Sequence, residues 1–196
     1  AKASKTGRPL LWKNRDTGTE HNFVEKVDAK NGNYAYVALY NGGDSSLRDA
    51  WLGMNEVGFA IMNTASYNLA PDTAKLKDQE GYVMSLALQK CRTLADFETL
   101  LDTISKPMGV QANFGLIDAN GDGAYYETDD FTYTKFSLSD AENGVLVRTN
   151  YSYTGEKDGG YGYIREDNAW YLLQPYLKDG NIEASTFTDG LSRSFY

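Results

Sequence analysis

The sequence is poor in the side chains that bind metals and form cross-links. It contains one cysteine, Cys91, and one histidine, His21, among 196 residues. A single cysteine cannot close an intrachain disulfide, and one Cys with one His gives too few ligands for a structural zinc site. A Ser-His-Asp hydrolase is also unfavourable, because no GxSxG nucleophile motif accompanies the lone histidine.

Basic clusters and long apolar runs are missing too. Lys and Arg together number 19 against 27 Asp and Glu, which gives a formal net charge of -8, and no basic run occurs along the chain. Nucleic acid and anionic membrane surfaces are therefore poor partners. No apolar run approaches the ~20 residues of a membrane-spanning helix, so the sequence predicts no membrane partner.

Tyrosine and glycine are plentiful, with 15 and 19 copies, and together they favour a sheet-rich fold with many turns. Apolar or alternating runs between turn signals predict strands, which we place at residues 9–16, 34–40, 57–63, 112–118, 123–129, 132–138 and 144–150. The last four strands have the spacing of an antiparallel meander.

A helical period occurs in the middle of the chain. It predicts two helices, 80–91 and 94–104. The chain breaks between them because Thr93 and Asp96 have the spacing of an N-terminal cap, which begins the second helix. Cys91 then falls on the buried row of the first helix, as an inert structural thiol.

A third helix is expected over 164–174. It should end at Pro175, because proline removes a helical N–H and clashes with the preceding turn. The order β, α, β, α predicts a single α+β domain over residues 1–196.

A short acidic stretch resembles the start of a calcium loop. Asp118, Asn120 and Asp122 have the spacing of the first ligands, but the flanking segments are β-like where an EF-hand needs helices. A hairpin turn is the favoured interpretation, and a calcium-binding module is kept as an alternative.

Four segments follow one another along the chain: GRPLLWKNRD at 7–16, GMNEVGFAIMNT at 53–64, RTN at 148–150 and LSR at 191–193. Together they resemble the N-terminal nucleophile (Ntn) hydrolases of the choloylglycine hydrolase and penicillin V acylase type, and most closely the acyl-coenzyme A:6-aminopenicillanic acid acyltransferase-like proteins. The resemblance implies an αββα sandwich of two antiparallel sheets between helix layers. It also implies a fragment that lacks the N-terminal strand with the nucleophile and the C-terminal continuation.

The resemblance assigns roles to five residues. Asp16 matches the aspartate that holds the α-amine of the nucleophile, and Lys13 stands three places earlier, where the family has an arginine. Asn63 and Asn150 match the asparagines of the oxyanion hole, and Arg193 matches an arginine beside the site. The resemblance implies no cofactor and no metal.

These residues imply an amidohydrolase or acyltransferase that cleaves the C–N bond of a small linear amide through an N-terminal cysteine upstream of the chain. A terminal cysteine can use its own α-amine as a base, which explains how an amidase works without histidine. A non-catalytic, sheet-rich domain that binds a ligand or glycan on its tyrosines is the alternative from another class. The bacterial-type family is compatible with a homo-oligomer and with a cytoplasmic, periplasmic or secreted protein.

Overall fold

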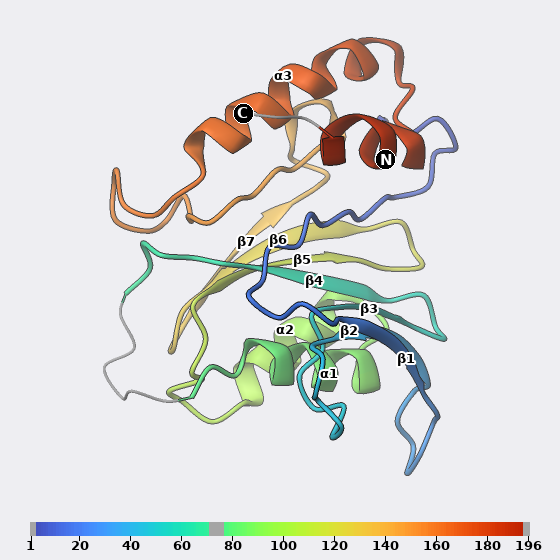
Figure 1. Ribbon diagram of the computed structural model, residues 1–196, viewed down its shortest axis with the longest axis vertical. Helices are drawn as coiled ribbons and strands as arrows, with labels where there is room; N and C mark the ends of the chain where they lie inside the picture. The colour runs from blue at the N-terminus through green and yellow to red at the C-terminus, as the bar shows by residue number, and fades with distance from the viewer. Residues whose placement is uncertain (1–2, 71–76, 194–196) are drawn as a thin grey trace.

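The computed structural model describes residues 3–70 and 77–193, which form three layers (Figure 1). An antiparallel sheet lies in the middle, two helices cover one of its faces, and a long helix with short C-terminal turns lies on the other side. None of the helices in this part of the chain has the length and apolar content that crossing a bilayer requires.

The sheet is a meander of seven antiparallel strands, in which each strand pairs with its neighbours in sequence. The strands are β1 (Phe23–Val27), β2 (Tyr36–Tyr40), β3 (Leu52–Asn55), β4 (Ala60–Ala65), β5 (Ala112–Ile117), β6 (Gly123–Thr128) and β7 (Tyr133–Ser137). Five of the predicted strands are confirmed as β2, β4, β5, β6 and β7. The pattern does not predict β1, an edge strand with mostly exposed side chains, or β3, which has only 4 residues.

Helices α1 (Glu80–Lys90) and α2 (Leu94–Thr103) pack the main core against one face of the sheet. They confirm the pair of helices that the period predicts. The hydroxyl of Thr93 accepts the backbone N–H of Asp96, whose carboxylate accepts the N–H of Thr93, so a capping box begins α2.

Helix α3 (Tyr163–Asp179) belongs to a second, smaller core on the opposite side of the sheet. Its Leu173 packs with Ile182 and with Trp12 of the N-terminal segment. A parallel bridge between Ser4 and Ile182 attaches the start of the described chain to the segment after α3. The N-terminal segment is thereby held across the sheet.

The strands expected at 9–16 and 144–150 are not formed. Both segments lie outside the seven-stranded ladder, and the second ends in a single bridge between Asn150 and Tyr161. A strand requires backbone pairing with a second strand, and no described segment pairs with these two along their length. The described residues therefore contain one sheet between helix layers, where the resemblance implies two, because these two segments do not pair into a second sheet. The α+β class is confirmed.

The predicted end of the third helix at Pro175 is wrong, because Pro175 lies inside α3. The helix continues to Gly180, whose backbone is left-handed with a φ of 63°. The N–H of Gly180 donates to the carbonyl oxygen of Leu177 at 3.3 Å. A glycine cap, rather than the proline, ends this helix.

Candidate active site

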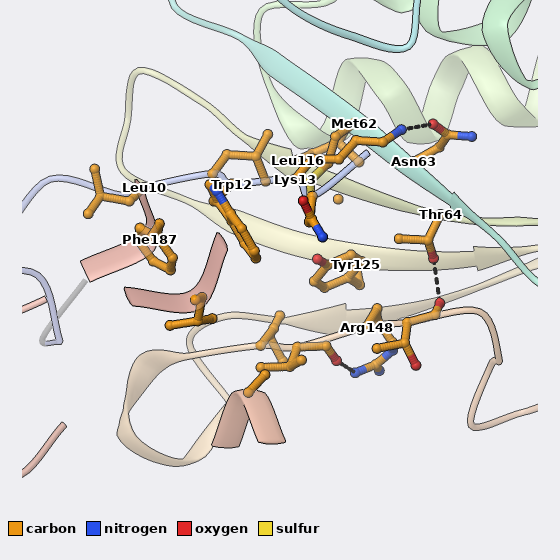
Figure 2. Close-up of a pocket in the computed structure, with 18 of the residues that line it drawn as sticks. Leu10, Trp12, Lys13, Met62, Asn63, Thr64, Leu116, Tyr125, Arg148 and Phe187 are labelled. Atoms are coloured by element: carbon orange, nitrogen blue, oxygen red, sulfur yellow. Dashed lines mark hydrogen bonds between the residues drawn. The ribbon is translucent and has the colours of Figure 1, made fainter. Parts of the chain in front are cut away.

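A cavity of about 730 Å³ lies between the sheet and the layer that contains α3 (Figure 2). Its floor is formed by β4, β5 and β6, and its walls by residues 9–17, residues 144–150 and part of α3. Cavities of this size are typical of small-molecule sites, so we take it as the candidate site.

Lys13 extends from the N-terminal segment to β4. Its Nζ donates to Asn63 Oδ1 at 2.6 Å and to the backbone oxygen of Trp51 at 3.0 Å. Burial, and to a smaller extent the charge of Arg15, lowers the pKa of Lys13 to about 7, while the charge of Glu80 opposes the shift. The ammonium therefore lies in a desolvated position, where it can gain or lose its proton near neutral pH.

Asn63 is held at both ends of its side-chain amide. Its Oδ1 accepts from Lys13, and its Nδ2 donates to Glu80 Oε2 at 2.6 Å. Glu80 is the first residue of α1 and is 6% exposed. Burial, followed by the charge of Asp78, raises the pKa of Glu80 to about 8. No described residue accepts the second Nδ2 hydrogen of Asn63.

Asn150 is held in the same manner. Its Oδ1 accepts from Arg165 Nη2 at 2.8 Å, and its Nδ2 donates to the backbone oxygen of Ala65 at 3.0 Å. A cation thus faces the amide oxygen of each asparagine and an acceptor faces each amide nitrogen. One Nδ2 hydrogen of Asn150 likewise has no acceptor within the described part of the chain.

The position of Arg165 depends on Gly162, which precedes α3 with a φ of 101°. A Cβ at Gly162 would lie 2.9 Å from Arg165 Nη2 and 2.7 Å from Thr149 Oγ1. Any other residue there would be strained and would displace the guanidinium. The sequence reasoning misses Arg165, because one arginine in a helical pattern is typical of a solvated face; the glycine-rich stretch before α3 is the only local signal.

The structure places Asp16 and Arg193 differently. Asp16 lines the cavity, is exposed, and forms no hydrogen bond or ion pair with a described residue. Arg193 ends the short helix Leu191–Arg193, lies outside the cavity lining, is 75% exposed and faces Asp189 at 4.0 Å. The cavity therefore brings four of the five predicted residues together and leaves Arg193 apart.

One part of the cavity is apolar. The ring of Trp12 stacks on Phe187 with 5.6 Å between the ring centroids, and Figure 2 shows this pair beside Leu10, away from Asn63. Further aliphatic side chains line the cavity: Leu116, Leu138, Val145, Val147 and Leu191. A cavity with a polar part and an apolar part suits an amphipathic ligand.

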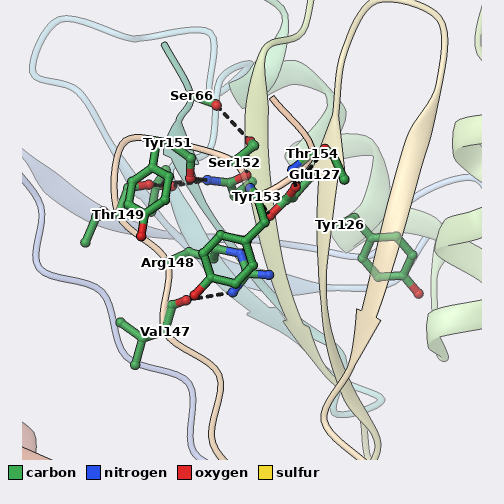
Figure 3. A network of polar contacts seen from close by, with 12 residues as sticks. Ser66, Tyr126, Glu127, Val147, Arg148, Thr149, Tyr151, Ser152, Tyr153 and Thr154 are labelled. Atoms are coloured by element: carbon green, nitrogen blue, oxygen red, sulfur yellow. Dashed lines mark hydrogen bonds and ion pairs between the residues drawn. The ribbon is translucent and has the colours of Figure 1, made fainter. Parts of the chain in front are cut away.

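A buried ion pair fixes the chain around Asn150 (Figure 3). Arg148 Nε donates to Glu127 Oε1 at 2.9 Å, and their side chains are 2% and 0% exposed. Glu127 also accepts the backbone N–H groups of Tyr153 and Thr154, at 2.9 and 2.8 Å. Residues on both sides of Asn150 are thereby attached to β6.

Two other residues singled out in the sequence lie away from the cavity. Cys91 follows α1 and is 1% exposed, and burial raises the pKa of its thiol to about 12. Asp118 lies in the turn between β5 and β6, where its Oδ1 accepts the N–H groups of Asn120 and Asp122, so the hairpin interpretation is confirmed. Within residues 3–70 and 77–193, no three metal-binding side chains gather in one place.

Compared by sequence, the chain matches no protein-family model and no curated protein. Its structure is similar to solved structures. A variant of the conjugated bile acid hydrolase from Clostridium perfringens gives a TM-score of 0.55 at 13% identity, over 90% of this chain and 71% of that one. The Caenorhabditis elegans ortholog of N-acylethanolamine-hydrolyzing acid amidase gives a TM-score of 0.61 at 16% identity, over 87% of this chain and 73% of that one.

These similarities define the class of fold. The antiparallel meander with helices on both sides is the Ntn-hydrolase fold. The resemblance to the choloylglycine hydrolase type, first given by four short segments, is confirmed at the level of the fold.

Proposed function

We propose that the protein is an amidohydrolase or acyltransferase that cleaves a linear amide through an N-terminal cysteine upstream of Ala1. The observation that carries this proposal is the meeting of Lys13, Asp16, Asn63 and Asn150 at one cavity, from distant parts of the sequence. The names of the two structures with this fold, a conjugated bile acid hydrolase and an N-acylethanolamine-hydrolyzing acid amidase, support it.

The proposed reaction begins at the cysteine. Its α-amine takes the thiol proton, and the sulfur attacks the amide carbonyl carbon, which forms a C–S bond and an oxyanion. The proton then passes from the α-ammonium to the leaving nitrogen as the C–N bond breaks, which gives a thioester and a free amine. Water completes hydrolysis by attacking the thioester, whereas a second amine completes acyl transfer, and either route restores the thiol.

The residues of the cavity have matching roles in this proposal. Asp16 has no partner within the described chain and binds the α-ammonium of the cysteine. Asn63 and Asn150 each direct one free Nδ2 hydrogen to the oxyanion, and loss of one such donor typically costs ~10²-fold to 10³-fold in rate. Lys13 and Arg165 hold the two amide oxygens. Arg193 stays a predicted site residue.

The apolar part of the cavity accommodates the acyl group of the substrate. The stacked rings of Trp12 and Phe187 and the aliphatic wall bury apolar surface, which contributes binding energy of roughly 25 cal/mol per Å². The amide then lies toward Lys13 and Asn63. A small-molecule amide with an apolar acyl group is therefore the proposed substrate class.

Intact-protein mass spectrometry tests this function. The full-length protein is incubated with amides that differ in acyl group, beside a variant in which the upstream cysteine is replaced by alanine. We expect an acyl adduct on the cysteine protein alone, together with release of the amine. A processed N-terminal cysteine that never acylates, beside unchanged amides, would favour the non-catalytic binding domain. In that alternative the exposed Tyr161 and Tyr171 are the first residues to test.

A further inference from the structure

Glu80 is a buried carboxyl that the proposed reaction does not use. Its Oε2 accepts from Asn63 Nδ2 at 2.6 Å. No cation in the described residues forms a direct ion pair with it. Lys13 instead binds the other end of the Asn63 amide. The Asn63 amide therefore bridges an amine and a carboxyl group.

The amide of Asn63 has one orientation that satisfies both neighbours. Lys13 Nζ donates to the amide oxygen, and as an ammonium it carries only donors. The amide nitrogen then faces Glu80, which accepts one of its two hydrogens. In the flipped amide, the nitrogen would face Lys13 Nζ and the oxygen would face the carboxyl group, so a protonated Lys13 or an ionised Glu80 would be repelled.

Other charged groups face this trio from the adjoining segments. Asp78 accepts the backbone N–H of Glu80 at 2.8 Å, and its charge disfavours a second carboxylate nearby. The charge of Arg15 disfavours a protonated lysine beside it. The N-terminus of α1 favours a carboxylate at its first residue. Arg48 and Asp49, which contact Gln79 and Gly81 at the start of α1, form an ion pair with each other.

We propose that Glu80 is a positioning residue, which accepts one Nδ2 hydrogen of Asn63 and so directs the other toward the substrate oxygen. This inference rests on the proposed function, in which Asn63 is an oxyanion donor. Without Glu80, the amide keeps a single anchor at Lys13 and can rotate about it. Because the oxyanion exists only after attack on the carbonyl, misalignment of the donor lowers kcat more than it raises KM.

Side-chain amide NMR tests the contact without turnover. The full-length protein is labelled at asparagine, the Asn63 signal is assigned with Asn63→Asp, and spectra are recorded above the Glu80 pKa of about 8. We expect the bonded amide hydrogen of Asn63 to move upfield in Glu80→Gln, because a neutral amide accepts more weakly than a carboxylate. Asp118→Asn is the matched control, since Asp118 is a carboxyl that is 4% exposed and does not line the cavity. An Asn63 signal that is identical in Glu80→Gln and wild type overturns the contact.

Steady-state kinetics of the full-length protein, recorded above the Glu80 pKa of about 8, test the role. We expect kcat to fall about tenfold in Glu80→Gln and further in Glu80→Ala, with KM within about twofold, and Asp118→Asn to keep wild-type values. If the NMR contact is lost while kcat is kept, Glu80 has no positioning role, although the amidase function stands. If the wild type acylates no amide at all, the proposed function fails, and the positioning role fails with it.

Discussion

Arg165 and Asn150 are 15 positions apart, and Nη2 of the arginine lies 2.8 Å from Oδ1 of the asparagine. The contact has the same form as that between Lys13 Nζ and Asn63 Oδ1, at 2.6 Å. In both pairs a basic side chain donates to the amide oxygen, so the N–H groups of the amide turn away from that side chain. Two oriented amides therefore lie at the cavity, each with one hydrogen that no described residue accepts.

Replacing Arg165 is expected to reduce turnover of the full-length protein by roughly tenfold to hundredfold in Arg165→Gln, because the amide of Asn150 loses its orientation. Arg165→Lys should give an intermediate loss, since an ammonium lacks the guanidinium fork. Arg193→Gln is the comparison, and we expect it to have the smaller effect, because Arg193 is 75% exposed and outside the cavity lining. Initial rates on one amide measure all three variants. A larger loss of turnover in Arg193→Gln would show that Arg193, rather than Arg165, is the arginine of the site.

The sequence predicts the elements that depend on local patterns. Periodicity and the Thr93 cap identify α1 and α2, and alternating runs between turns identify the meander β5–β7. The sequence-based prediction fails where pairing between distant segments decides whether a strand forms. The runs at 9–16 and 144–150 have the composition of strands but no partner along their length in the described chain. Pro175 remains helical because α3 continues to a glycine cap.

The candidate site could be predicted only in part. The resemblance names Lys13, Asn63 and Asn150, which the fold brings to one cavity. Glu80 and Arg165 are missed, because a charged residue at a helix start or on a helix surface is typical of a solvated position. Only the packing of α1 and α3 shows that these two charges reach the asparagines of the cavity.

Removing the buried cation of the cavity wall is expected to destabilise the fold strongly. Arg148→Met leaves the carboxylate of Glu127 buried without its charged partner, which typically costs about 3–5 kcal/mol. Lys135→Met is the matched control, because its pair with Glu98 is partly exposed, and such pairs contribute about 0–1 kcal/mol. Urea unfolding of both variants measures the difference. Equal losses would contradict a special role for the buried pair.

The thiol of Cys91 is expected to resist labelling in the folded protein. It is 1% exposed, and burial raises its pKa to about 12, so the reactive thiolate is scarce at neutral pH. A coloured disulfide reagent should react with Cys91 only as fast as the protein unfolds, and at once in denaturant, which serves as the control. Rapid labelling under native conditions would show that the thiol is accessible.

Glu80 and Lys13, the two ionisable groups that contact Asn63, are expected to change the free energy of unfolding with pH in opposite directions. The pKa of Glu80 rises from 4.5 to about 8 on burial, so between these values the folded state binds more protons than the unfolded state. The stabilisation that Glu80 contributes is fully present below pH 4.5 and is lost as the pH rises through 8. The pKa of Lys13 falls from 10.5 to about 7, so the unfolded state binds more protons in that window. The stabilisation that Lys13 contributes is fully present above pH 10.5 and is lost as the pH falls through 7.

Difference curves separate these two contributions. The free energy of unfolding of wild type minus that of Glu80→Gln should decrease with rising pH between 4.5 and 8, with a slope of at most ~1.4 kcal/mol per pH unit. Wild type minus Lys13→Met should instead increase between 7 and 10.5. Subtraction cancels every group that titrates alike in both proteins, so urea unfolding at constant ionic strength is sufficient. Flat difference curves would mean that neither group is perturbed by burial, and two slopes of the same sign would contradict the assignment of a buried acid and a buried base.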